Sequence, residues 1–403
     1  MEESSEEDDS SLLHNRNLRG LVLSNMLSGF TRSIPGAALN VYIYDIASSY
    51  SILGYMSSIP SLLSIFFSRF WSVLSDMSGR RKPFIITSMI FSLLFTFLYA
   101  FWATRPEHFL YISIVGSIFS VGGGAFNAAL TSVSSKIGEA VGKYSFAVGA
   151  SSTAGSMMSG WFVEHYGISK AFQISLAGTA ASAALFAVFY HEEGSVINVR
   201  RNLRTALKHT LTFRLPSGGN TVLLLSMLLA LKGSFYGLPA SMKLYMLSEN
   251  SKTIYTVVLS TAGVLAFITY PFYGRLVDRY GPKKTLLASS IAYSLYLPIL
   301  ALVDSFPVFV FLWAIPIGSL QGLALMAIKA LISSPEMRAQ TMSTIDSISS
   351  ITGSIGTLFV GRLMDCIGLS QPLYIATVLN AATIPILINL KGEKYGQMPP
   401  MRR

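Results

Sequence analysis

The stretch GRLVDRYGPKK at residues 274–284 carries a pattern that recurs along this chain. A small residue is followed by an apolar residue, an acid and a glycine at fixed spacings. Its four copies are Ser72, Leu74, Asp76, Gly79; Gly160, Phe162, Glu164, Gly167; Gly274, Leu276, Asp278, Gly281; and Gly361, Leu363, Asp365, Gly368. Neighbouring copies within each half lie 88 and 87 residues apart, and the two halves are offset by 202 and 201. Four copies at two consistent spacings indicate an internally duplicated chain.

Composition places this duplication in a membrane. Of 403 residues, 51% are apolar and 12% are charged, whereas soluble proteins carry roughly 25% charged residues. A membrane-spanning helix needs roughly 20 mostly apolar residues. Such stretches predict twelve helices, at about 18–45, 50–74, 83–103, 109–134, 143–163, 171–190, 220–245, 253–275, 284–303, 306–332, 339–361 and 371–389. The expected fold class is therefore an all-α membrane protein.

The spacing of the copies predicts how these helices are related. An offset near 88 residues contains three helices, an odd number, so consecutive three-helix units are inverted. An offset near 202 contains six helices, so the two halves are parallel. Lysine and arginine set the orientation: twenty-one fall in segments on the side of the N-terminus and five on the other side. Cytoplasmic loops carry the excess of such cations, so both termini are expected inside the cell.

The sequence divides accordingly into five parts. Residues 1–15 are acidic and polar and read as a disordered cytoplasmic tail, and residues 391–403 form a second cytoplasmic tail. Two six-helix bundles, 16–191 and 220–390, flank a basic linker at 192–219. Within it, Val199, Leu203, Leu207 and Leu211 recur every four residues. This spacing fits an amphipathic helix on the inner leaflet, and a basic linker with only local helix is the alternative.

The motif at 274–284 resembles the signature loop of the major facilitator superfamily (MFS), which lies between helices 2 and 3 and again between helices 8 and 9. The first copy, SVLSDMSGRRK at 72–82, resembles it less well because Ser72 replaces the usual glycine. The resemblance covers the chain after residue 16. It implies two six-helix bundles around a central cavity, and transport by alternating access.

The same resemblance implies that Asp76 and Asp278 latch the cytoplasmic side when the transporter faces outward. The alternative is that the motif residues fix only topology and turn geometry. The residues expected in the gating loops are Asp76, Gly79, Arg80, Gly274, Arg275, Asp278, Arg279, Gly281, Lys283 and Lys284.

Two cations lie deep in predicted helices, where an ionisable residue is costly and usually functional. Arg32 and Lys232 are 200 residues apart, which places them in equivalent helices of the two halves. We expect them to face the cavity and bind an anion, an arrangement that also resembles the organophosphate–phosphate antiporters of the superfamily. The alternatives are pairing with an internal acid or snorkelling to an interface.

Three further polar residues complete the predicted site. Asn127 and Gln321 lie inside helices and are candidates for lining the cavity, with an interhelical hydrogen bond as the alternative. Asp346 is the acid placed well inside a helix, so it is the candidate for carrying a coupling proton. It could equally neutralise Lys232 or Lys329. Lys329 itself is expected to snorkel to the cytoplasmic surface.

Several function classes lose support. The five histidines and single cysteine lack metal-ligand spacing, and no Walker-type ATP loop is found, so no metal or cofactor is predicted. The net charge of +10 lies in loops between apolar runs, which argues for membrane topology and against a nucleic-acid surface. We expect a monomeric cell-membrane transporter of an anionic or polar metabolite, driven by a proton or an exchanged anion, rather than an enzyme. A multidrug or sugar efflux permease and a non-transporting sensor remain as alternatives.

Overall fold

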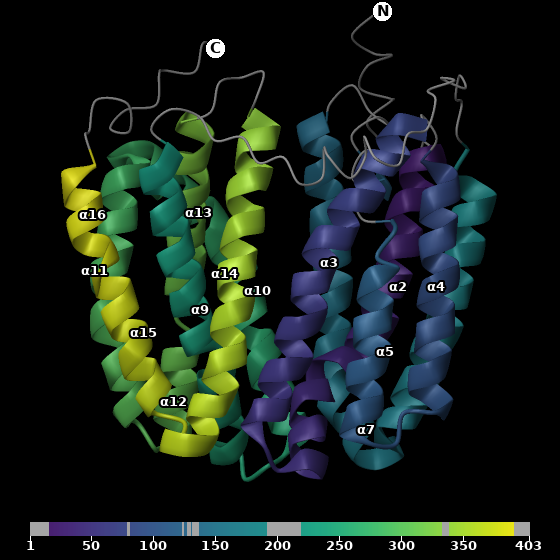
Figure 1. Ribbon diagram of the computed structural model, residues 1–403, viewed down its shortest axis with the longest axis horizontal. Helices are drawn as coiled ribbons and strands as arrows, with labels where there is room; N and C mark the ends of the chain where they lie inside the picture. Colours follow the sequence, from purple (N-terminus) through teal and green to yellow (C-terminus); the bar gives the residue numbers. More distant parts are fainter. Residues whose placement is uncertain are drawn as a thin grey trace, which may run out of the picture. The chain divides into compact units, whose positions relative to one another are not determined.

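A computed structural model of the chain describes residues 16–78, 81–122, 125–126, 130, 137–191, 219–332 and 338–390. Across these ranges the regular structure is helical, and no strand occurs in them. The helices are α2 (Arg16–Ala47), α3 (Tyr50–Ser78), α4 (Lys82–Phe101), α5 (Pro106–Ile118), α7 (Ile137–Phe189), α9 (Gly219–Leu247), α10 (Lys252–Tyr280), α11 (Pro282–Leu302), α12 (Phe306–Trp313), α13 (Ile317–Leu331), α14 (Arg338–Ile367), α15 (Gln371–Ala381) and α16 (Thr383–Asn389) (Figure 1). The predicted all-α fold class is confirmed.

The prediction of two helices at 143–163 and 171–190 is confirmed, because non-helical backbone at Gly167 divides α7 into two helices. Other predicted boundaries were wrong. The predicted helices 306–332 and 371–389 are each broken, between α12 and α13 and between α15 and α16. Conversely, α10 and α14 continue five and six residues past their predicted ends at 275 and 361. A polar turn continues the backbone hydrogen bonds of a helix beyond the apolar stretch, so hydropathy alone ends such a helix too early.

Within the described residues, eight helical segments are long and apolar enough to cross a membrane. Large apolar side chains on these helices stay exposed, including Leu295, Leu302 and Val378 at 67%, 70% and 69%. An apolar surface of this kind fits lipid rather than water. The chain is thus a multi-pass membrane protein. The fourth predicted helix, 109–134, is described as helix over α5 and then only in fragments, so the count of twelve is not fully resolved.

The chain forms two compact units that do not coincide with the two halves of the sequence. The first contains residues 1–47, 63–212 and 252–260, and the second contains 48–62, 213–251 and 261–403. Each unit therefore includes the beginning of one helix, α10 or α3, from the other half of the sequence. Each also has its own apolar core, packed around Leu18, Leu21 and Phe186 in the first unit and around Leu225, Leu286 and Ile328 in the second.

The glycine that closes each repeat copy has a backbone role. Gly167, Gly281 and Gly368 have φ values of 82°, 82° and 85°, in the left-handed region that L side chains rarely adopt. Each lies where one helix ends and the next begins. The fourth member, Gly79, lies outside the described residues. This conformation explains why the repeat ends in glycine.

Candidate functional site

A buried lysine anchors a polar network in the second unit. Lys232 of α9 is 6% exposed, and its Nζ donates a hydrogen bond to Oε1 of Gln321 on α13 at 2.7 Å. Gln321 Nε2 donates in turn to Ser290 Oγ on α11 and to Asn380 Oδ1 on α15, each at 3.1 Å. Asn380 Nδ2 closes the network by donating to Ser290 O at 2.6 Å and to Ser294 Oγ at 2.9 Å. The network thus joins four helices, α9, α11, α13 and α15, and two of them supply the amides that orient the lysine.

Aromatic rings surround the ammonium group. Lys232 Nζ lies 3.7 Å from the centre of the Tyr293 ring, a distance at which the ring face attracts a cation. The Tyr236 ring lies 6.0 Å from the Tyr293 ring and 6.0 Å from the Trp313 ring. The indole N–H of Trp313 is buried and has no acceptor within the described part of the chain. The network is therefore flanked by a donor that an additional acceptor could satisfy.

Two other buried lysines show what distinguishes Lys232. Lys243, on the same helix, bonds Ala301 O at 2.7 Å and pairs with Asp304 at 3.1 Å. Lys329 pairs with Asp346 at 2.6 Å. No salt bridge to Lys232 occurs among the described residues. Its charge is therefore balanced by a neutral amide and an aromatic ring, without a carboxylate.

The Lys329–Asp346 pair joins α13 to α14. Lys329 is 8% exposed, so the prediction that it snorkels to the surface was wrong; a nearby acid satisfies it inside the helix bundle instead. The Asp346 side chain stays 57% exposed. Of the alternatives for Asp346, the structure provides pairing with Lys329. One partner of the pair is thus buried and the other is exposed.

In the first unit, Arg32 lies on α2, three residues before a proline inside this continuous helix. Pro35 lacks a backbone N–H. On either side of it, the side chain of Ser159 on α7 bonds the backbone groups of Ile34 and Ala38. The Ser159 hydroxyl accepts from Ala38 N–H at 3.0 Å and donates to Ile34 O at 2.5 Å. In a regular helix those two backbone groups would bond each other. Arg32 keeps an exposed side chain, and no hydrogen bond or ion pair to it occurs in the described ranges.

The predicted gate motif at 274–284 is mostly helix rather than loop. Gly274, Arg275, Asp278 and Arg279 lie in the last turns of α10, and only Gly281 separates α10 from α11. The Asp278 carboxylate is exposed. The first motif is less complete, because Gly79, Arg80 and the side chain of Asp76 lie outside the described residues.

Two lysines that follow these motifs cap helices. Lys283 Nζ donates to Leu390 O at 2.6 Å and to Ile388 O at 3.2 Å, and Lys82 Nζ donates to Tyr190 O at 2.7 Å. A lysine at a helix C-terminus satisfies carbonyls that have no partner within the helix. Lys283 therefore has a packing role besides any contact with lipid. Lys284 is exposed.

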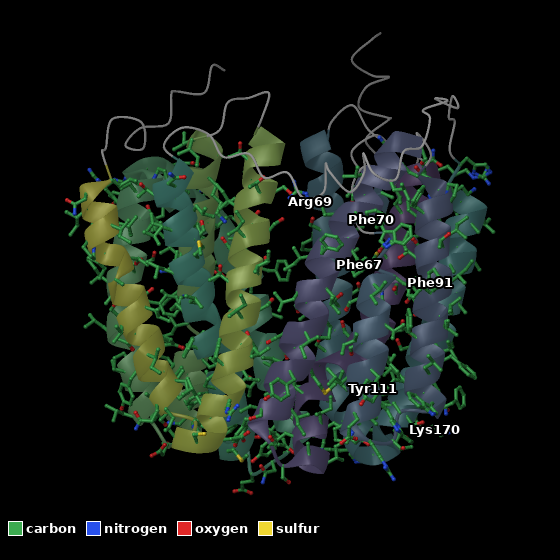
Figure 2. The ribbon with its side chains drawn as sticks, in the orientation of Figure 1. Phe67, Arg69, Phe70, Phe91, Tyr111 and Lys170 are labelled. Atoms are coloured by element: carbon green, nitrogen blue, oxygen red, sulfur yellow. The ribbon has the colours of Figure 1, made fainter. Side chains whose placement is uncertain are left out.

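Charged residues lie at both ends of the first unit. Arg69 of α3 and Lys170 of α7 lie towards opposite ends of that unit (Figure 2).

The site contains residues that the sequence pattern did not single out. Asn380 carries the same signal as Gln321, an amide inside a predicted helix, and was passed over. Ser290, Tyr293 and Trp313 have no such signal, because hydroxyl and aromatic residues are common throughout the chain. Asn127, the fourth predicted binding residue, lies outside the described residues.

Membrane-crossing helices with cations and amides held in their interior define a polytopic membrane carrier. A profile of the Major Facilitator Superfamily matches residues 21–250 and 224–397, so the chain belongs to this superfamily of transporters. Multidrug resistance protein MdtG of Klebsiella pneumoniae (strain 342) is 22% identical over 353 residues, which cover 84% of this chain and 81% of that protein.

Solved structures share the fold. A variant of the nucleoside transporter NupG superposes with a TM-score of 0.73 at 15% identity, covering 92% of this chain and 99% of that one. The human organic anion transporter MFSD10 superposes with a TM-score of 0.66 at 14% identity, with 92% and 99% covered. At such identities the likeness concerns the fold, so the substrate has to be argued from the residues of this chain.

Proposed function

We propose that this transporter carries an anionic or polar organic metabolite, unchanged, by alternating access. The observation behind the proposal is the buried Lys232, whose charge meets no carboxylate in the described residues. Arg32, from the equivalent helix of the first half, stays a candidate for the same anion.

The physical argument concerns the cost of a buried cation. An ammonium group taken out of water loses several kcal/mol of solvation, which a hydrogen bond to a neutral amide restores only in part. An anionic substrate supplies the missing charge. Lys232 donates one described hydrogen bond, to Gln321, although an ammonium has three donors. Its remaining donors are available to a carboxylate or phosphate.

A second candidate rests on the aromatic residues of the same site. Tyr236, Tyr293, Tyr296 and Trp313 form a continuous set of ring contacts. Rings of this kind stack on sugars and lipophilic compounds. The relative MdtG is called a multidrug resistance protein, so efflux of such compounds is the alternative function. Under that alternative, Lys232 has only a structural role and holds α9, α11 and α13 together.

The energy source is proposed to be a proton or an exchanged anion. Asp346 is the candidate proton carrier, since protonating it would remove the counter-charge of the buried Lys329. We further propose that the transporter is a monomer in the cell membrane. The distribution of lysine and arginine supports placing both termini in the cytoplasm.

The test is a ligand panel on the purified protein in detergent. Phosphorylated and carboxylated metabolites, neutral sugars and lipophilic cations are each added, and the melting temperature is measured. A ligand that binds the folded state raises its stability with occupancy. We expect stabilisation by anions, with loss of at least about tenfold in apparent affinity in Lys232→Gln, since a charge-assisted hydrogen bond contributes roughly 1.5–3 kcal/mol.

Lys243→Gln is the matched control, because Lys243 is equally buried on the same helix but already has an acid partner. It should lower the melting temperature of the free protein and leave the anion-induced shift intact. Arg32→Gln tests the first unit in the same way. Stabilisation only by sugars or lipophilic cations, or an anion shift that survives in Lys232→Gln, would discard the anion site.

A further inference from the structure

The acid of the fourth repeat copy holds the beginning of α3. The Asp365 carboxylate accepts hydrogen bonds from Tyr50 N–H at 2.8 Å and from Ser51 N–H at 2.8 Å. It also accepts from the hydroxyls of Ser49, at 3.0 Å, and Ser51. The first N–H groups of a helix have no partner within it and attract negative charge. Asp365 therefore supplies an N-terminal cap to α3 across more than 300 residues of sequence.

The acid of the second copy does the same at the beginning of α10. The Glu164 carboxylate accepts from Thr253 N–H at 3.0 Å and from the Thr253 hydroxyl. Gly160 N–H, one turn earlier on α7, donates to Thr256 Oγ1 at 2.9 Å. Lys252, at the start of α10, also pairs with Asp45 at the end of α2, at 2.5 Å.

The first residue of copies two and four permits this approach. A Cβ on Gly160 would lie 1.9 Å from Lys252 O, and a Cβ on Gly361 would lie 2.5 Å from Tyr50 O. Both are shorter than any ordinary contact, so only glycine lets the two helices meet here. A Cβ on Gly274, the equivalent residue of the third copy, would meet nothing within 4 Å.

The two caps are related by the internal duplication. Glu164 and Asp365 are equivalent residues of the two halves, and the capped positions Thr253 and Ser51 are equivalent as well. In each case a helix from one half of the sequence is capped by an acid from the other half. The corresponding acid of the third copy, Asp278, makes no hydrogen bond or ion pair within the described ranges. Within the described residues, copies two and four thus each contact the beginning of a helix.

We propose that Glu164 and Asp365 are positioning residues of the transport cycle, forming a paired latch on the face opposite to the 274–284 motif. The latch deepens the proposed alternating access and rests on it. While both carboxylates cap α10 and α3, the outer ends of the two sequence halves are tied together. Opening that face requires both caps to release. If one half moves as a rigid body, Glu164 separates from the beginning of α10 and the beginning of α3 separates from Asp365 in the same movement.

Hydrogen exchange measured by mass spectrometry tests the latch without a substrate. The capped amides of Tyr50 and Ser51 fall in one peptide, and that of Thr253 falls in another. In Asp365→Asn the exchange of the first peptide should rise about tenfold or more, because several charge-assisted hydrogen bonds are lost. The decisive expectation is that the second peptide also exchanges faster, although its own cap is unchanged. Glu164→Gln should give the reciprocal result.

Glu107→Gln is the control, since Glu107 is an exposed acid in the first turn of its own helix, α5. It should change neither peptide. Asp365→Glu keeps the carboxylate and should restore much of the protection. Faster exchange at the mutated cap alone would show two independent local caps and overturn the proposal.

A covalent version covers the case in which a cap variant fails to fold. Ser51→Cys with Asp365→Cys, in a Cys366→Ser background, would replace the hydrogen bond by a disulfide. Oxidation should slow exchange of the 252–256 amides, and a reductant should restore it. Unchanged exchange at 252–256 after complete oxidation would also overturn the latch. Because neither experiment involves a ligand, their outcome is separate from that of the anion site.

Discussion

A methyl group on Gly160 offers a direct test of the close contact between α7 and α10. In Gly160→Ala the new Cβ would lie 1.9 Å from Lys252 O, 2.2 Å from Lys252 C and 2.5 Å from Thr253 N. Ordinary contact begins near 3.4 Å, so the start of α10 has to move about 1.5 Å from α7. Backbone atoms, unlike the end of a flexible side chain, cannot turn aside.

The energy lost follows from the bonds that this movement breaks. The Gly160–Thr256 hydrogen bond at 2.9 Å would lengthen past any useful distance, at a cost of about 1 kcal/mol. The two bonds from Thr253 to Glu164 are charge-assisted but partly exposed, so together they contribute about 2 kcal/mol. Alanine gains about 1 kcal/mol over glycine inside a helix. The net expectation is a loss of about 2 kcal/mol.

Thermal unfolding of purified variants in detergent measures this difference. Gly274→Ala is the matched control, because its Cβ meets nothing and only the helix gain of up to about 1 kcal/mol remains. Gly361→Ala, with a shortest contact of 2.5 Å, should fall between the two. The expected order of melting temperatures is therefore Gly160→Ala lowest, then Gly361→Ala, then Gly274→Ala at or above the unmodified protein. A Gly160→Ala protein as stable as Gly274→Ala would refute the reasoning.

Three other substitutions have defined outcomes. Ser159→Ala removes the two hydrogen bonds that the Ser159 hydroxyl makes to the α2 backbone, so the free energy of unfolding should fall by about 2 kcal/mol, whereas Ser159→Thr should retain most of it. Asp346→Asn leaves Lys329 buried without its counter-charge, so the free energy of unfolding should fall by about 1–2 kcal/mol, a value reduced because Asp346 is 57% exposed. If the pair is only structural, replacing both residues by apolar ones should restore stability and leave the pH dependence of transport unchanged. Burial raises the pKa of the Asp365 carboxyl. The hydrogen bonds from Ser51, Tyr50 and Ser49 together lower it by more, so the pKa lies below its ordinary value of 3.8. The ionised carboxylate therefore stabilises the capped state above about pH 4, and this stabilisation is lost as the pH falls. The difference in melting temperature between the unmodified protein and Asp365→Asn should shrink below about pH 4. A difference that is constant down to pH 3 would contradict this.

The sequence predicted the fold because membrane helices and repeats leave long-range signals. Apolar stretches give the spans, and the spacing of the four motif copies gives the symmetry. Helix ends were less predictable, since α10 and α14 continue through polar turns that hydropathy does not recognise. Gly167, Gly281 and Gly368 were found from the pattern, but their left-handed backbone came only from the structure.

The predicted site was less complete for a different reason. Lys232 and Gln321 could be named because a charge or an amide inside a membrane helix is rare. Their neighbours Ser290 and Tyr293 belong to residue types found everywhere in this chain, and only the packing of α9, α11 and α13 brings them together. The pairing of Lys329 with Asp346, seventeen residues away, was one of several open alternatives, because sequence distance does not tell which acid a buried lysine meets.

The long-range cap on α3 has a consequence for how the protein is made. Ser51 leaves the ribosome 314 residues before Asp365, which at typical synthesis rates is roughly 15–60 s. Thr253, in contrast, follows Glu164 by 89 residues, so its cap is already waiting when α10 emerges. The nascent chain must therefore hold the start of α3 uncapped in the membrane until nearly the last helices have inserted. A ribosome stalled or a chain truncated before residue 365 would release a protein with one end of α3 still open, and the quality-control machinery of the cell could recognise that end.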